Sequence, residues 1–286
     1  MISTFIKKLT GSALILFVSC QASYANQQCL PTKEIVESNN LILSDGTIIQ
    51  PDNVKAIRAE FYSDNNYIYG YQYVEFDRCE QINLNSLSYT FNTTGITNQI
   101  YSKLLQVSGS WSQSYDLLAE QPLNDRNKAE IPPYHKEGNI DYHINNHGLI
   151  TSSNDSFTIN DGDQSSGESR YYFDTAQRLT HYTTRSDDGY SSGSYYFTYD
   201  HAGKLISSQS PGSYLTYIYD NQDRIFQIFQ LTTYSNGIFS RQLNCVKWDN
   251  RGGCTKSVTD ALEIYPDKTS RHQQFFSSAT YQYWDE

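Results

Sequence analysis

Three of the six histidines, His135, His143 and His147, lie close together in the sequence, with Glu137 and Asp141 between them. Imidazole and carboxylate groups are the ligands that zinc prefers, so this cluster has the composition of a metal site. Its spacing favours another interpretation. A His-x-x-x-His pair shares one face of a helix, whereas this segment has the pattern of a hairpin, with His143 in a strand and His147 in the turn. We expect solvated polar side chains here and no bound metal.

Two other segments carry side chains of the types used in calcium binding and in nucleophilic catalysis. Residues 161–168 alternate oxygen ligands as a calcium loop does, but Ser166 stands at the position of the loop glycine and Tyr172 at that of the bidentate acid. Ser110 follows a glycine, yet no Gly-x-Ser-x-Gly elbow is present to expose a nucleophile. The sequence also lacks a phosphate-binding glycine loop and a dinucleotide fingerprint. It therefore assigns no catalytic residue, no metal and no cofactor, and both segments are expected to be turns.

Four cysteines follow the first 25 residues, at Cys29, Cys79, Cys245 and Cys254. An even number in an oxidising compartment predicts two structural disulfides. Cys245 and Cys254 flank a turn-like segment at 249–253, so we expect them to pair across a hairpin, which leaves Cys29 for Cys79. Spacing does not prove this connectivity, and three pairings remain open. A metal site would need ligand-spaced pairs such as Cys-x-x-Cys, which the sequence does not contain.

The N-terminal 25 residues have the composition of a cleaved secretory signal peptide. Two lysines precede a short apolar segment at 14–18, which is too short to span a bilayer. Small residues before the predicted cut favour cleavage after Ala25. An alternative makes Cys20 a lipid-modified cysteine, but Phe17 stands where a lipoprotein signal usually has an aliphatic residue. We expect a periplasmic or secreted protein, with the lipoprotein as the less favoured alternative.

The composition excludes some classes of partner. The chain has 21 basic and 31 acidic residues, and loss of the signal peptide with its two lysines would bring the net charge from −10 to about −12. Such a surface repels nucleic-acid phosphates and anionic lipids, so neither is an expected partner. No apolar run after the signal reaches membrane-spanning length. The 25 tyrosines and 13 phenylalanines favour β-sheet over helix.

A short motif recurs through the second half of the chain: an aromatic residue, Asp, two polar residues, a turn-forming residue, a basic residue and an aliphatic one. Asp or Asn can accept hydrogen bonds from amides two residues on, and glycine tolerates the positive φ of a turn, so each copy predicts a β-hairpin. Between copies, side chains alternate as in strands, with Tyr195, Phe197 and Tyr199 on one face. The copies are Phe173–Leu179, Tyr199–Leu205 and Tyr219–Ile225, with weaker ones at 76–82, 144–150 and 248–254.

With these copies the chain resembles the tyrosine-aspartate (YD) repeats of Rhs-type proteins, most clearly over residues 170–231. In that family, long arrays of hairpins wind into a β-sheet shell and the repeats themselves are non-catalytic. This chain keeps the basic position only at Arg178, Lys204 and Arg224, and its copies are too few to enclose a cavity. The resemblance therefore does not imply a complete toxin-enclosing shell.

The predicted fold is mostly β with little helix: an antiparallel meander of β-hairpin repeats that forms an open sheet or a sandwich. A short helix is expected after Pro31, at 32–36, and the first strands are expected at 54–62, 67–76 and 82–91. The expected segments are a signal peptide at 1–25, a β-rich region at 26–121, a linker or long loop at 122–138 and a YD-like hairpin-repeat region at 139–286.

The function expected from these features is binding without catalysis. The favoured partner is a protein, such as a cognate toxin or a surface protein, because an acidic binder is steered onto basic effectors. The chain would then be a periplasmic immunity or accessory factor. One alternative is a cell-wall or glycan-binding protein or hydrolase, in which exposed tyrosine and tryptophan rings stack on sugars. A structural component of the envelope is the other.

Overall fold

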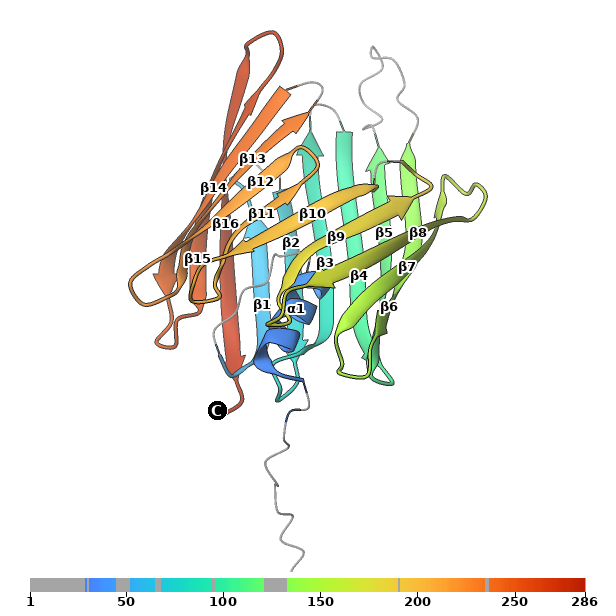
Figure 1. Cartoon of the computed structure of the whole chain (residues 1–286). Helices are drawn as coiled ribbons and strands as arrows, with labels where there is room; N and C mark the ends of the chain where they lie inside the picture. Colours follow the sequence, from blue (N-terminus) through green and yellow to red (C-terminus); the bar gives the residue numbers. More distant parts are fainter. Residues whose placement is uncertain are drawn as a thin grey trace, which may run out of the picture.

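The computed structural model of the chain describes residues 29, 31–44, 52–64, 68–93, 96–120, 133–189, 191–234 and 237–285. One helix and sixteen strands lie within these ranges (Figure 1). Their bounds are α1 Lys33–Leu43, β1 Val54–Tyr62, β2 Ile68–Phe76, β3 Ile82–Thr93, β4 Ile96–Val107, β5 Ser110–Glu120, β6 Tyr134–Ile144, β7 Ile150–Ile159, β8 Ser165–Phe173, β9 Leu179–Ser186, β10 Gly193–Tyr199, β11 Leu205–Ser210, β12 Ser213–Tyr219, β13 Ile225–Tyr234, β14 Gly237–Trp248, β15 Cys254–Ile264 and β16 Ser270–Tyr283.

The strands form one closed antiparallel barrel. Each strand pairs with its neighbours in the sequence, and β16 returns to pair with β1. In this closing pair Ile57 lies opposite Tyr281 and Phe61 lies opposite Ser277. The predicted open sheet or sandwich was therefore wrong. Hairpin patterns are the same in an open meander and in a barrel, whereas closure removes both sheet edges and depends on pairing between the two ends of the chain.

The barrel includes strands from both sides of the segment 122–138. Residues 134–138 form the beginning of β6, which pairs with β5. Residues 122–132 and the predicted signal peptide lie outside the described residues. The helix expected after Pro31 runs from Lys33 to Leu43. No helix in the described ranges is long and apolar enough to cross a membrane.

Each copy of the repeated motif is the turn between two strands at the same end of the barrel. In the turn that begins at Asp174, one carboxylate oxygen accepts hydrogen bonds from the amides of Ala176 and Arg178. The fourth residue of this turn, Gln177, has a φ of 65°, in the left-handed region that favours glycine. The same pair of bonds recurs in the turns that begin at Asp77, Asn145, Asp200, Asp220 and Asp249.

Helix α1 lies across this end of the barrel, which we call the plugged end (Figure 1). Its apolar residues Leu41, Ile42 and Leu43 are buried in the main hydrophobic cluster, together with inward side chains from strands around the barrel. The core therefore lies at the plugged end. The other members of the cluster are Val54, Val74, Phe76, Ile82, Leu104, Trp111, Tyr142, Ile150, Leu179, Leu205, Tyr217 and Tyr283.

Three consecutive polar residues of α1 bind three of the motif turns. Asn39 donates to the carbonyl of Gly148 at 2.8 Å and accepts from the amide of Ile150 at 2.9 Å. Asn40 makes the same two bonds to the turn before β3, and Ser38 makes them to the turn before β9. Buried polar groups are costly unless they are hydrogen-bonded. These side chains therefore satisfy backbone groups that the bulged strand ends leave without a ladder partner.

Candidate functional site

The core fixes which side chains of each strand face the inside of the barrel. Successive side chains alternate between the two faces of a sheet. A residue therefore faces inward if it lies two or four positions from a core residue on the same strand, or directly opposite an inward residue of the neighbouring strand. On β10, Tyr195 and Phe197 face inward, whereas Tyr196 faces outward and is 51% exposed. Beyond the core, many inward side chains are partly accessible to solvent, although some, such as Lys136 and Phe157, are buried. A barrel of sixteen strands is wide enough to leave a water-filled interior, which we call the lumen.

Four stacked aromatic rings lie on the lumen wall and form what we call the aromatic ladder: Tyr171 of β8, Tyr182 of β9, and Tyr195 and Phe197 of β10. The ring centres of Tyr171 and Tyr182 lie 5.4 Å apart. Those of Tyr182 and Tyr195 lie 4.3 Å apart, with ring planes at 7°. All four side chains are only partly buried. Such pairs stabilise one another by about 0.5–1.5 kcal/mol, and here they also leave aromatic surface accessible from the lumen.

Hydroxyl groups lie beside the ladder on the same wall. Ser153 Oγ lies 3.0 Å from the hydroxyl of Tyr171, and the hydroxyls of Ser169 and Thr184 lie 2.8 Å apart. Ser153 lies directly opposite Ser169, and Ser169 lies directly opposite Thr184, so these side chains share the inner face with the ladder residues. The wall thus combines apolar ring faces with hydrogen-bonding groups, which is the chemistry that an uncharged polar ligand with apolar faces requires.

Nearer the plugged end, the inward phenols are committed to backbone carbonyls. The hydroxyl of Tyr199 donates to the carbonyl of Leu179, that of Tyr219 donates to Leu205, and that of Tyr281 donates to Cys254. Burial is the main cause that raises the pKa of Tyr219 to about 12 and that of Tyr281 to about 12. These phenols are therefore neutral donors that brace the strand ends, and they differ from the accessible rings of the ladder.

A buried ion pair ties the β9–β10 loop to the lumen wall. Lys136 of β6 is 5% exposed, and its Nζ lies 2.6 Å from Asp188 Oδ2 in the loop and 3.7 Å from Asp155 Oδ2 of β7. The amide and hydroxyl of Ser191 also donate to Asp188. Lys136 faces inward on β6, and its Nζ lies 3.8 Å from the ring centre of Phe157 on β7, so the lysine side chain reaches across β7 on the inside of the barrel to meet the loop.

The acids of this cluster have displaced pKa values with identifiable causes. Burial opposes ionisation of Asp188, but hydrogen bonds from Lys136 and Ser191 hold the pKa of its carboxyl below the usual range. Burial raises the pKa of Asp155, and its bonds to Tyr115 and Lys136 offset this only in part. Burial and the bond to Asp155 raise the pKa of Tyr115. Each group is engaged with a neighbour, as in an ion pair that fixes a loop.

The close contacts of this cluster require glycine at position 138. A Cβ atom built there would lie 2.6 Å from the hydroxyl oxygen of Tyr115 and 2.7 Å from Cβ of Phe157. The ammonium of Lys136 lies 3.8 Å from the ring centre of Phe157, in a cation–π contact. The absence of a side chain at Gly138 thus lets the wall pack closely where the loop is tied.

The outside of the barrel carries charges at many outward positions. Arg58, Lys103 and Arg170 face outward from β1, β4 and β8, and acidic residues such as Asp116 and Glu137 face outward from β5 and β6. A lipid-facing barrel wall has a continuous apolar band, and a cation at the bilayer midplane costs about 2–4 kcal/mol. The outward charges therefore favour a barrel surrounded by water.

The cluster of histidines and carboxylates that has the composition of a metal site lies on the outside of β6. Four of its members face outward along this strand: His135, Glu137, Asp141 and His143. His147 lies in the turn that follows. The Nε2 atom of His135 lies 3.1 Å from Asp116, and that of His143 lies 2.9 Å from the side chain of Asn154. No group of three or more ligating side chains in the described part of the chain is placed to hold a metal.

The other residues considered from the sequence are the serine near a glycine, the segment like a calcium loop and the four cysteines, and they lie in strands, turns or disulfides. The hydroxyl of Ser110, at the beginning of β5, donates to the carbonyl of Tyr142. Residues 161–164 lie between β7 and β8. The structure contains both expected disulfides, Cys29–Cys79 and Cys245–Cys254. The first ties the chain before α1 to the β2–β3 turn, and the second joins β14 to β15.

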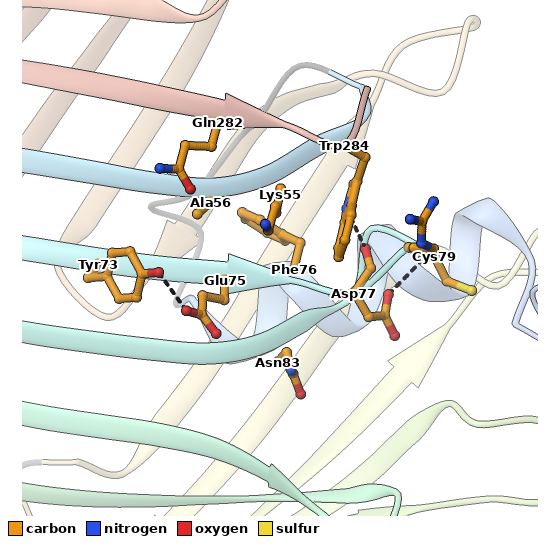
Figure 2. Close-up of a pocket in the computed structure, with 11 residues that line it drawn as sticks. Lys55, Ala56, Tyr73, Glu75, Phe76, Asp77, Cys79, Asn83, Gln282 and Trp284 are labelled. Atoms are coloured by element: carbon orange, nitrogen blue, oxygen red, sulfur yellow. Dashed lines mark hydrogen bonds between the residues drawn. The ribbon is translucent and has the colours of Figure 1, made fainter. Parts of the chain in front are cut away.

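A recess of about 300 Å³ lies on the outside of the barrel beside the plugged end (Figure 2). The ring of Trp284 lines it, with its Nε1 donating to the carbonyl of Asp77. Lys55 and Arg78 lie over this ring, 5.4 Å and 4.7 Å from its centre. This volume is at the lower limit for small-molecule sites, and the ring already has two cationic neighbours. The recess is thus a weaker candidate than the lumen.

Comparisons with known proteins do not assign this chain to a family. No family model matches the chain, and no curated protein matches its sequence. Among solved structures, the chain is similar to a porin-like protein from Bacteroides uniformis, with 10% identity, a TM-score of 0.46, and coverage of 82% of this chain and 99% of that one. A likeness this distant carries no argument about function.

The interpretation of the chain as a short, Rhs-like YD hairpin-repeat protein was therefore wrong. No family model supports it, and the six motif copies are turns at one end of a closed barrel. The motif arises because a bulged turn of this geometry requires an acceptor side chain at its first position and a left-handed backbone at its fourth. Turn chemistry is therefore sufficient to produce the motif without a relation to that family.

Proposed function

We propose that this chain is a non-enzymatic protein of the cell envelope that binds a glycan in the lumen of a water-exposed barrel. The observation that carries the proposal is the aromatic ladder, whose four rings face the lumen and are only partly buried. Three of these rings, Tyr171, Tyr182 and Phe197, also pack against the edge of the core cluster, so the ladder continues the core into the lumen and keeps part of its aromatic surface accessible there. The predicted signal peptide supports a place outside the cytoplasm.

The chemistry of the wall supports a glycan in particular. Sugar rings present apolar C–H faces and a rim of hydroxyls, so they suit aromatic rings flanked by hydroxyl groups. The ladder has these flanking groups in the partly accessible Ser169 and Thr184. The acid and base side chains of the nearby cluster are engaged with one another, which favours binding over hydrolysis.

A structural role in the envelope is a second candidate. It is favoured by the outward faces of β10–β13, where no residue is charged and where two barrels could lie against each other. The role expected from the sequence, as a periplasmic immunity or accessory factor for a toxin or surface protein, stays a prediction.

The test is calorimetric titration of the mature full-length protein with chitohexaose, maltohexaose and purified peptidoglycan fragments. We expect at least one glycan to bind, and Tyr182→Ala to weaken that binding by at least tenfold, or about 1.4 kcal/mol. Tyr182→Phe keeps the ring and should bind nearly as well as the wild type. Tyr196→Ala is the matched control, because this tyrosine is on the neighbouring strand but faces outward.

Two results would overturn the proposal. One is a folded wild-type protein that binds none of these glycans. The other is an equal loss of binding in the Tyr182→Ala and Tyr196→Ala proteins, since the lumen would then not be the site. Circular dichroism checks that each variant is folded, and Tyr195→Ala tests the same ladder if Tyr182→Ala does not fold.

A further inference from the structure

The outward face of the barrel changes character between β9 and β14. Strands β10, β11, β12 and β13 contain no charged residue, although charged residues make up 18% of the chain. In β14, Arg241 pairs with Gln230 and Ala261 and faces the lumen, as those residues do. The other charged residue of β14, Lys247, pairs with Lys256 of β15 near the plugged end, so the outward side of these strands lacks charge between that end and the far end of the barrel.

Large apolar side chains occupy this face. Six of them, which we call the uncharged wall, are between 37% and 45% exposed. In the sheet, Leu231 lies directly opposite Tyr214, and Phe229 lies opposite Thr216 and Gln242. The six are Tyr214, Ile218, Phe226, Phe229, Leu231 and Ile238. An exposed apolar patch of this extent on a water-exposed protein marks an interaction surface.

The charge of the molecule indicates what lies against this wall. The chain has a net charge of −10, and acids such as Asp116, Glu137 and Asp141 face outward from β5 and β6. Two copies of the chain would repel each other through those strands. The uncharged wall is the face on which two copies can approach without burying like charges.

The composition and area of the wall also suit a second copy. The buried centres of homodimer interfaces are depleted of charged residues and enriched in aromatic ones. Each of the three aromatic side chains has about 150–250 Å² to bury, so at about 40% exposure they present roughly 180–300 Å², to which the three aliphatic side chains add. A standard interface buries roughly 800 Å² per partner, so the interface would also include polar residues of the wall such as Gln242.

We propose that this chain forms a two-fold symmetric homodimer through the uncharged wall of β12–β14. A two-fold axis sets the same patch of both copies face to face, so Leu231 and Phe229 of one copy contact the same region of the other. The proposal does not depend on the glycan-binding function, because the lumen lies on the opposite side of the sheet.

The experiment is sedimentation equilibrium of the mature full-length protein and two matched variants. Leu231→Glu places a carboxylate in the centre of the wall and should raise the dissociation constant of the dimer by at least a hundredfold. Leu105→Glu is the control, since Leu105 is 37% exposed and faces outward from β4, away from the wall. It should leave the dimer intact. Gln242→Glu adds the charge without removing an apolar side chain, so it covers the case in which Leu231→Glu does not fold.

A wild-type protein that stays monomeric would overturn the proposal, and so would equal dissociation of the Leu231→Glu and Leu105→Glu dimers. Vesicles of neutral phosphatidylcholine provide a further arm. A monomer that binds these vesicles through Leu231 would show that the uncharged wall meets a lipid surface instead of a second copy.

Discussion

At the plugged end of the barrel, inward side chains such as Leu179 and Ile150 are fully buried against α1 and one another. Farther along the same wall, inward side chains such as Leu243 and Tyr195 are only partly buried. The difference arises because a single helix fills one end of a barrel that is too wide for its own side chains to fill. The buried apolar core is therefore concentrated at the plugged end, and the part of the lumen between it and the buried cluster of Lys136 and Phe157 is accessible for binding.

The largest expected effect comes from replacing leucine by alanine at the plugged end, and the same replacement farther along the lumen tests the difference between the two regions. Leu179→Ala removes a side chain that is 0% exposed, and we expect it to lower the free energy of unfolding by about 3 kcal/mol through lost burial and a residual cavity. Leu243→Ala removes a half-buried side chain on the same inner face and should cost about 1 kcal/mol. Urea denaturation of both variants measures the difference. Equal losses would show that the core extends throughout the lumen.

A smaller loss of stability is expected when the hydrogen bonds between α1 and one motif turn are removed. Asn39→Ala removes the donor to Gly148 and the acceptor for Ile150, and leaves two buried backbone groups without these bonds. We expect a loss of about 2 kcal/mol in the free energy of unfolding. Asn154→Ala, on the outside of β7, is the control and should change stability by less than about 0.5 kcal/mol. Faster hydrogen exchange of the Ile150 amide in Asn39→Ala would locate the loss, and unchanged exchange there would contradict the assignment.

The sequence predicts the local parts of this structure and not their assembly. The first strands, expected at 54–62, 67–76 and 82–91, correspond to β1, β2 and β3, and the turn beginning at Asp174 follows from its own residues. Closure of the barrel was missed because it pairs β1 with β16, which have no turn between them. The alternation on β10 indicated one shared face for Tyr195 and Phe197, but it did not show that this face lines a lumen.

Long-range polar contacts escaped prediction for the same reason. Lys136 and Asp188 are separated by 52 positions, and nothing in either local sequence distinguishes a buried ion pair from two solvated charges. Ser38, Asn39 and Asn40 likewise have the composition of an exposed helix face, and they are buried because motif turns from three parts of the chain surround them. Only the assembled barrel brings these partners together.

The smallest expected effect concerns the far part of the lumen, where the Lys136–Asp188 pair fixes the β9–β10 loop. The pKa of Asp188 is lower in the folded protein than its ordinary value of about 3.9, so its contribution to stability is present above that pH and is lost as the pH falls through the folded pKa. Asp188→Asn removes this contribution. We therefore expect the wild type to be more stable than Asp188→Asn at pH 7, and the difference to shrink steadily below about pH 4. Urea denaturation of both proteins across this range measures it. Asp187→Asn is the control, because Asp187 lies in the same loop but accepts hydrogen bonds from Ser166 of β8 instead of from Lys136. A stability difference that stays constant from pH 7 to about pH 3 would mean that the ionised carboxylate of Asp188 does not hold the loop against Lys136.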